Sequence, residues 1–235
     1  MSLFAQTQEY SLAEEDKLFT KVENVQILTT TGDNIKLSAL YEREPVILAL
    51  IFTRCTGVCS PLIRNLQDNL ARLRPKEQFK ILVVSFDSAD KPTDMENYQK
   101  MLNVYADNKW IFGVTENILD LTGSVGFYPQ WDSVSRQFEH DALLVGINGN
   151  GYIVKKLLGI RNDNSLNGLI KAISNEFVIS YPLPRKNALF TCFTYDPITG
   201  ERKLSLGLLI LLIPAVGTII LLFLISRRKK GNTAL

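Results

Sequence analysis

The chain has 235 residues, a formal net charge of +2 and only three cysteines. The length suits one sizeable domain with appendages. Basic residues are scattered except at the very end of the chain, so nothing suggests a nucleic-acid-binding surface. Three cysteines are too few for a disulfide-dense scaffold.

The first 21 residues are polar and acidic, and they lack the apolar core that a signal peptide needs. If Met1 is the true start, residues 1–21 form a flexible N-terminal arm; alternatively, the chain begins with the tail of a longer leader. Residues 22–180 then form the main domain. It opens with a predicted hairpin, in which residues 22–28 and 35–40 are strands around a turn signal at residues 31–34.

Residues 46–73 contain the pattern that organises the domain. Residues 46–52 are apolar and rich in β-branched side chains, which predicts a strand buried on both faces. A turn that carries Cys55 and Cys59 follows, which we call the Cys turn. An amphipathic helix with Ser60 as its N-cap, the Cys helix, comes next. Both thiols therefore lie near a helix N-terminus, where the helix dipole and the free amides favour thiolate.

Two cysteines at this spacing can have three chemical roles. They can form a structural disulfide, cycle between dithiol and disulfide, or hold a soft metal such as copper(I), zinc or an iron–sulfur cluster. The pair alone is a weak metal signal, because structural zinc sites use four ligands. A peroxidase would need one cysteine of low pKa in a pocket shaped for peroxide, which a sequence cannot show.

A second parallel strand is predicted at residues 79–86, with the Cys helix crossing over one face of the sheet between the two strands. Asp87, Asp90 and Asp94 follow at the edge where open α/β sheets bind ligands. They could tune a metal site or contact a partner. For Asp90 and Asp94, loop and N-cap roles are the favoured interpretation.

Four further elements are predicted before and after the histidine region. They are a helix at residues 93–102, a strand at residues 110–114, a helix capped by Thr115, and a final amphipathic helix at residues 166–177.

His140 is the only histidine of the chain. A lone histidine is more often structural than a ligand, but this one precedes an apolar strand at residues 142–147 and a hairpin signal at residues 148–151. In a thioredoxin-like layout, that strand edge can face the Cys turn. Two thiolates and one imidazole make a ligand set typical of copper sites.

Three aromatic residues lie in the loop that leads to His140. Tyr128, Trp131 and Phe138 could shield a metal, meet an apolar partner or simply bury the loop. We therefore leave their role open at this level.

The runs FTRCTGVC and SFDSADKPTD, together with the single histidine before a strand and an NGNG hairpin, resemble the Sco/SenC family over roughly residues 22–174. The resemblance implies an α/β, thioredoxin-like fold with an added N-terminal hairpin. It also implies that Cys55, Cys59 and His140 bind a copper ion, Cu(I) or Cu(II), in the assembly of cytochrome c oxidase. Thr56 stands where the family commonly has proline after the first cysteine.

The C-terminal quarter predicts a membrane anchor. Residues 181–203 form a linker with several prolines, which resembles the juxtamembrane segment of C-terminally anchored bacterial family members. The linker contains Cys192, which is either an accessory thiol or an inert packed cysteine. Residues 204–226 form one predicted transmembrane helix. The basic tail at residues 227–235 is predicted to be cytoplasmic, which places the main domain on the periplasmic side of a bacterial membrane.

We therefore expect a membrane-anchored copper metallochaperone that delivers copper to, or prepares, the copper-bearing subunit of cytochrome c oxidase. Further expected partners are other copper chaperones or thiol reductases, and membrane lipid, but no nucleic acid. The alternative is a thiol-disulfide oxidoreductase that keeps the copper-ligand cysteines of its partner reduced, using Cys55 and Cys59. This alternative needs no histidine, so His140 is the discriminating residue.

Overall fold

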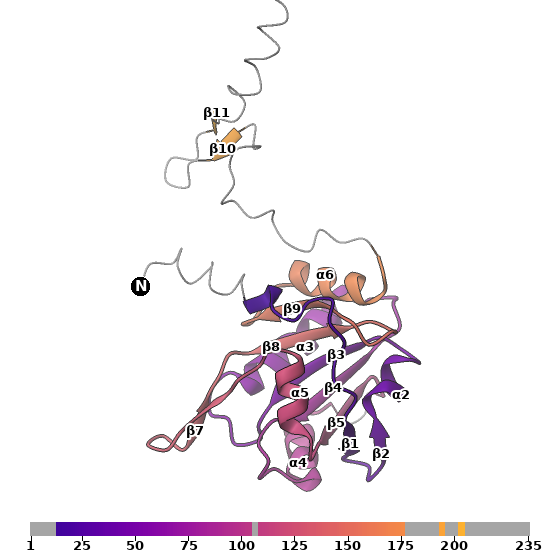
Figure 1. The fold of residues 1–235 in the computed structure, drawn as a ribbon, viewed down its shortest axis with the longest axis vertical. Helices are drawn as coiled ribbons and strands as arrows, with labels where there is room; N and C mark the ends of the chain where they lie inside the picture. The colour runs from indigo at the N-terminus through magenta and orange to yellow at the C-terminus, as the bar shows by residue number, and fades with distance from the viewer. Residues whose placement is uncertain (1–12, 105–107, 177–192, 196–201, 205–235) are drawn as a thin grey trace, which may run out of the picture. The chain divides into compact units, whose positions relative to one another are not determined.

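The computed structural model describes residues 13–104, 108–176, 193–195 and 202–204. Its main domain is built on a seven-stranded sheet with the strand order β2-β1-β5-β4-β3-β8-β9 (Figure 1). The strands are β1 (Gln26–Thr29), β2 (Asn34–Lys36), β3 (Val46–Ile51), β4 (Lys80–Ser85), β5 (Trp110–Val114), β8 (Leu143–Ile147) and β9 (Ile153–Leu158).

The centre of the sheet is the apolar part of the chain. All six residues of β3 are buried, because β3 lies between β4 and β8 and is covered on both faces. β3, β4 and β5 run parallel, whereas β8 runs antiparallel to β3 with Ala49 opposite Leu144. The buried strand and the parallel crossover predicted from the sequence are confirmed.

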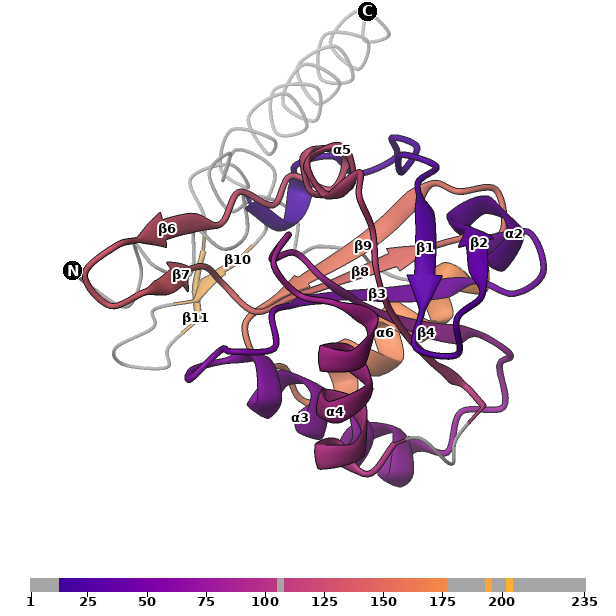
Figure 2. The same cartoon turned by 90° about the horizontal axis from the view of Figure 1, so that it is seen from below.

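Helices cover both faces of the sheet (Figure 2). α3 (Cys59–Leu73), α4 (Pro92–Leu102) and α6 (Asp163–Ile173) lie on one face, and α5 (Ile118–Ser124) lies on the other. α3 buries the apolar stripe Leu62, Ile63 and Leu66, as its amphipathic pattern predicted. This layered α/β arrangement is the thioredoxin-like fold.

Three predicted boundaries are corrected. α3 begins at Cys59, not after Ser60, because Val58 occupies the N-cap position. The second strand of the first hairpin is only three residues long, and the chain turns into α2 (Leu37–Tyr41) because Leu37 and Tyr41 are buried one helical turn apart. Asn117 rather than Thr115 is the N-cap of α5.

The sequence also missed a small hairpin in the segment before His140. β6 (Gln130–Asp132) and β7 (Gln137–Glu139) pair antiparallel outside the main sheet and project from its edge (Figure 1). All three residues of β6 are exposed, so burial could not impose the alternating pattern by which strands are recognised.

Part of the predicted flexible arm is attached to the domain. The Phe19 amide donates to the Ile153 carbonyl at 2.8 Å, and the Ile153 amide donates to Thr20 at 3.0 Å, so this segment pairs with β9. Glu14 accepts a hydrogen bond from the Leu158 amide at 2.8 Å. These residues of the predicted arm therefore contact β9, Phe19 and Thr20 through their backbone and Glu14 through its carboxylate.

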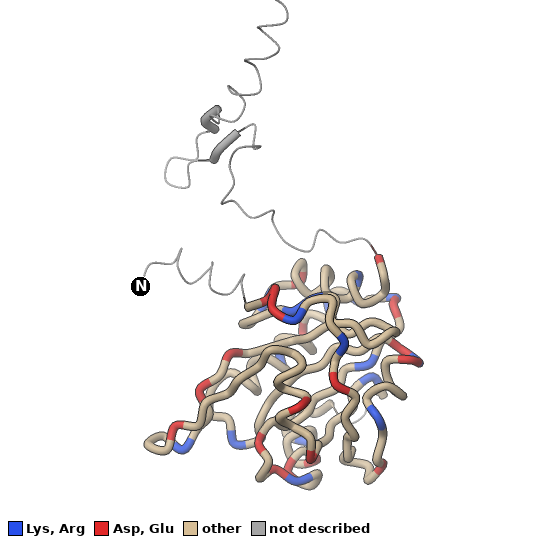
Figure 3. Tube along the Cα trace, viewed as in Figure 1, with Lys and Arg blue, Asp and Glu red and all other residues tan. Residues whose placement is uncertain are grey.

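Acidic and basic residues are interspersed along the trace of the domain (Figure 3). Within the predicted linker at residues 181–203, β10 (Phe193–Tyr195) pairs antiparallel with β11 (Arg202–Leu204). No helix among the residues that the structure describes is long and apolar enough to cross a membrane. The predicted transmembrane helix falls almost wholly outside those residues, as do Cys192 and the basic tail.

Candidate metal centre

The candidate site lies at the edge of the sheet where β3 and β4 end and β8 begins. β3 leads into the turn that carries Cys55, and α3 starts from the same turn at Cys59. Since β8 is antiparallel to β3, its first residue, Leu143, lies beside the end of β3. His140, three residues earlier in the chain, is thereby brought to the Cys turn. The sheet thus unites residues that are far apart in sequence.

The two cysteines differ in their surroundings. Cys59 is the first residue of α3 and is 1% exposed, packed within the hydrophobic core. Cys55 is only partly buried, and its Sγ accepts a hydrogen bond from the Gly57 amide at 3.4 Å. One thiol is therefore fixed by a helix, whereas the other sits on a turn within reach of solvent.

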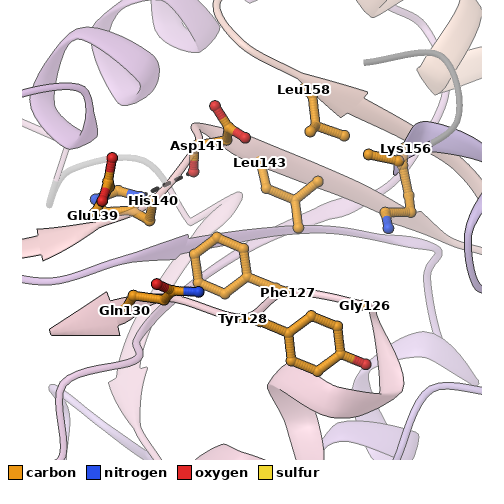
Figure 4. A pocket seen from close by; sticks show the side chains of 11 residues that line it. Gly126, Phe127, Tyr128, Gln130, Glu139, His140, Asp141, Leu143, Lys156 and Leu158 are labelled. Carbon is orange, nitrogen blue, oxygen red and sulfur yellow. Dashed lines mark hydrogen bonds between the residues drawn. The ribbon is translucent and has the colours of Figure 1, made fainter. Parts of the chain in front are cut away.

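His140 faces both thiols through one ring nitrogen. Its Nε2 lies 3.6 Å from Cys59 Sγ and 3.8 Å from Cys55 Sγ. Its Nδ1 lies 2.9 Å from the Asp141 carbonyl oxygen (Figure 4). A carbonyl can only accept, so Nδ1 carries the proton and Nε2 presents its lone pair to the thiols. This is the tautomer that a metal-binding histidine needs.

Aromatic rings hold the imidazole in place. The centroids of Phe86, Phe52 and Phe127 lie 5.0, 5.6 and 6.0 Å from that of His140, all in edge-to-face arrangements. Phe138 packs on Phe52 and Phe86 at 5.3 and 5.4 Å. The rings leave the histidine few alternative orientations, and they lower the polarity around its thiol-facing side.

The thiols share one proton. The hydrogen bond from Cys59, aided by His140 and two backbone amides, lowers the pKa of Cys55 to about 4 against the opposing effect of burial. The same contact with Cys55, together with burial, raises the pKa of Cys59. Cys55 is therefore a thiolate at neutral pH while Cys59 stays protonated, which corrects the expectation that the helix terminus favours thiolate at both.

The pKa of His140 is raised. Burial favours the neutral ring, but the contacts with the Cys55 thiolate and the Asp141 carbonyl outweigh it. The imidazole therefore gains a proton more readily than a histidine in water, and this proton competes directly with any metal at Nε2.

The three aspartates have separate local roles. Asp90 is buried and accepts hydrogen bonds from the Thr53 amide at 2.8 Å, from Thr53 Oγ1 at 2.6 Å and from Ser85 Oγ at 2.6 Å. It therefore fastens the start of the Cys turn to the end of β4. Asp94 caps α4 by accepting from the Lys91 amide at 2.9 Å, as predicted. Asp87 forms an ion pair with Arg54.

The three aromatic residues in the loop before His140 have different surroundings. Phe138 joins the rings around His140, and Trp131 stacks edge-on against it at 4.9 Å while remaining 51% exposed. Tyr128 is 67% exposed and lines a cavity of about 610 Å³, which is also lined by His140, Phe127 and Lys156 (Figure 4).

Sequence reasoning missed Gln137. Its side chain reaches from β7 to the Cys turn, where Nε2 donates to the Arg54 carbonyl at 3.2 Å and Oε1 accepts from the Thr56 amide at 3.3 Å. Nothing in the local pattern marks a glutamine in a polar segment as a contact residue, so only the fold reveals it.

All three predicted ligands are brought together. The two sulfurs and a ring nitrogen of His140 lie within 4.8 Å of one another, a geometry that could hold one metal ion. Thiolate and imidazole donors favour soft or borderline metals, and the same two thiols are close enough for dithiol–disulfide chemistry.

Comparisons with known proteins concern the family and the fold of the chain. The family model SCO1/SenC matches residues 17–174. Among solved structures, Arabidopsis thaliana ScoI with copper bound has 18% identity and a TM-score of 0.56, covering 66% of this chain and 99% of that one. Bradyrhizobium japonicum ScoI with copper bound has 18% identity and a TM-score of 0.52, covering 65% and 99%.

A third similar structure is BsSco, a member of the Sco family of cytochrome c oxidase assembly proteins in which a disulfide switch was identified. It has 21% identity and a TM-score of 0.55, covering 66% of this chain and 95% of that one. No curated protein sequence matches the chain. The structural similarities support the thioredoxin-like fold, and because the family model spans more than half of the sequence, this chain belongs to the SCO1/SenC family.

Proposed function

We propose that the protein is a copper metallochaperone that binds copper through Cys55, Cys59 and His140 and delivers it to, or prepares, the copper centre of cytochrome c oxidase. The convergence of the two sulfurs and the imidazole nitrogen within 4.8 Å carries this proposal. The copper bound in the Arabidopsis thaliana and Bradyrhizobium japonicum proteins of similar fold supports the choice of metal.

The donor set favours copper on chemical grounds. Thiolates select copper(I), and imidazole accepts both copper(I) and copper(II). A structural zinc site would use four protein ligands, whereas the described residues bring only three such side chains together here. One ligand, Cys55, is a thiolate already at neutral pH and is ready to bind.

The difference in burial between the two cysteines favours stepwise transfer of copper. Cys59 is deeply buried, whereas Cys55 lies on a partly exposed turn. A thiolate of the acceptor can therefore displace Cys55 first, and the remaining ligands follow one at a time. Copper moves by ligand exchange in this scheme, so no step requires a free copper ion in solution.

A second candidate is thiol-disulfide exchange with the cysteines of the oxidase subunit. The low pKa of Cys55 favours it, since thiolate is the attacking form. Cys55 would attack the disulfide of the partner and release one partner thiolate. Cys59, on losing its proton, would then attack Cys55 Sγ, release the second partner thiolate and leave a Cys55–Cys59 disulfide. The disulfide switch identified in BsSco supports this chemistry in a protein of similar fold.

The proposal places the site outside the cytoplasm. The uncharged run that begins at residue 204 and the four basic residues at 227–230 favour a single C-terminal membrane anchor with the main domain on the periplasmic side of a bacterial membrane. There the domain would meet the copper-bearing oxidase subunit, and other copper chaperones or thiol reductases could load or reduce it.

Competition titrations of copper(I) and copper(II) against wild type and His140→Ala test the function. Loss of the imidazole should weaken binding by about tenfold or more, the scale seen when metal sites are damaged. Oxidase maturation in cells should fall as well, although the Cys55–Cys59 disulfide still forms. The matched cysteine variants are Cys55→Ser, which should abolish tight binding, and Cys192→Ser, which should not.

Equal copper affinity of wild type and His140→Ala would remove His140 from the site. If thiol exchange also survived in that variant while Cys55→Ser abolished it, the function would be that of the oxidoreductase.

A further inference from the structure

The side chain of Gln137 connects the two halves of the candidate site. Its Nε2 donates to the Arg54 carbonyl at 3.2 Å, and its Oε1 accepts from the Thr56 amide at 3.3 Å, with Thr56 Oγ1 at 3.4 Å. Arg54 and Thr56 are the two residues that flank Cys55. Gln137 belongs to β7, which leads directly into His140. One side chain thus links both neighbours of one proposed ligand to the strand that carries another.

A carboxamide meets both contacts at once, because it carries a donor and an acceptor side by side. A backbone carbonyl can only accept and a backbone amide can only donate, so the orientation of the Gln137 amide is fixed by its partners. A glutamate could not donate to Arg54, and an apolar side chain could form neither bond. Proline at position 56 would have no N–H to give. Thr56, where the Sco/SenC family commonly has proline, supplies this N–H, as any residue other than proline would.

Of the three proposed ligands, Cys55 most needs such support. Cys59 is held by the first turn of α3 and by burial, and His140 is held by the Asp141 carbonyl and the surrounding rings. Cys55 lies on a partly exposed turn, whose start at Thr53 is fastened by Asp90. Arg54 is also paired with Asp87. Gln137 adds hydrogen bonds to the backbone on both sides of Cys55.

We infer that Gln137 is a positioning residue that holds Cys55 against His140 and thereby sets the affinity of the site for copper. The inference deepens the proposed function and rests on it, since it assumes that Cys55 and His140 bind the same ion. Gln137 itself does not touch the ion: it acts through the backbone on both sides of Cys55.

Gln137→Met, with Gln130→Met as its matched control, tests the inference. Methionine keeps the length of glutamine but forms neither hydrogen bond. Gln130 lies on the partner strand of the same hairpin, opposite Glu139, and no described hydrogen bond joins its side chain to the Cys turn. In a copper(I) competition titration, Gln137→Met should bind about tenfold more weakly, as for other residues that orient metal ligands, while Gln130→Met should match wild type. Thermal unfolding should show that both variants remain folded.

A second measurement uses the reduced, metal-free protein. Because His140 is the only histidine, its imidazole ¹⁵N resonances are assigned without ambiguity. Gln137→Met should move them towards the values of Cys55→Ser, since both changes remove the thiolate contact, and Gln130→Met should leave them in place. Shorter Gln137→Asn should give an intermediate result in both measurements.

The outcomes distinguish failure of the inference about Gln137 from failure of the proposed copper function. If Gln137→Met equals Gln130→Met in both measurements, Gln137 is not a positioning residue. If wild type fails to bind copper(I), the proposed function fails, but the imidazole resonances still decide whether Gln137 holds Cys55 against His140.

Discussion

Cys59 Sγ and His140 Nε2 lie 3.6 Å apart although 81 residues separate them in the chain. The antiparallel pairing of β8 with β3 produces this proximity, since it brings the short segment before β8, which contains His140, to the turn that follows β3. The site therefore depends on the register of two central strands, which are among the most deeply buried parts of the protein.

The first prediction concerns protons released on copper binding. In the metal-free protein above the raised pKa of His140, Cys55 is a thiolate, the imidazole is neutral and only Cys59 holds a proton. Copper(I) binding should therefore release about one proton there, and about two below the His140 pKa, because a ligating imidazole must be neutral. The affinity should thus fall more steeply with decreasing pH once His140 titrates, starting above the ordinary histidine range.

Isothermal titration calorimetry in buffers of different ionisation enthalpy measures the number of protons. In His140→Ala the second proton should disappear. Release of two protons by His140→Ala would show that Cys55 is protonated in the metal-free protein, contrary to the shared-proton arrangement.

The second prediction concerns oxidation. Cys55 and Cys59 are both free in this structure, and their sulfurs lie within 4.8 Å of each other as part of the site. We expect a reversible disulfide in the metal-free protein, and we expect the disulfide to prevent copper binding because thiolates are the ligands. Mass spectrometry of alkylated protein gives the redox state, and copper titration of the fully oxidised sample gives the affinity. Full affinity of the oxidised protein would contradict the ligand assignment.

The elements and ligands that could be predicted from sequence are those whose signals are local and strong. β3, β4 and β5 were recognisable because buried parallel strands are continuous apolar runs, and the β8–β9 turn was recognisable from its Asn-Gly repeat. The meeting of Cys55 with His140 was expected from the family resemblance and a thioredoxin-like layout, not from either residue alone.

Other features depend on contacts that no local pattern encodes. The β6–β7 hairpin is almost entirely exposed, so no alternation of apolar residues marks it. Asp90 was interpreted as a loop residue because its three donors come from Thr53 and Ser85 across the sheet edge. The division of the thiols into one thiolate and one thiol arises from their burial and mutual contact, which a helix-terminus argument ignores.

The third prediction concerns membrane topology, which rests on sequence alone. A reporter that is active only in the cytoplasm, fused after Leu235, should be active, because the four basic residues at 227–230 are expected to stay inside. The same reporter fused after Ser174, which removes the predicted anchor, serves as the comparison. Replacing the four basic residues with glutamine should reduce the orientation bias. An inactive Leu235 fusion, together with activity of a second reporter that works only outside the cytoplasm when it is fused at the same position, would overturn the predicted orientation.

The fourth prediction concerns the buried carboxylate beneath the Cys turn. Asp90→Ala removes the acceptor for the Thr53 amide, Thr53 Oγ1 and Ser85 Oγ, which leaves buried donors without a partner. The free energy of unfolding, measured in denaturant, should fall by about 2–3 kcal/mol. Asp94→Ala is the matched control, since it removes only an exposed helix cap and should cost about 1 kcal/mol.

The same pair of variants separates stability from site geometry. Thr53 lies two residues before Cys55, so releasing it from Asp90 should also weaken copper(I) binding when measured under conditions where the variant is fully folded. Asp94→Ala should bind copper(I) as wild type does, because α4 carries none of the proposed ligands. Unchanged affinity in folded Asp90→Ala would mean that the Cys turn keeps its shape without this anchor, because its remaining contacts, including those of Gln137 and the Arg54–Asp87 ion pair, are enough to hold Cys55.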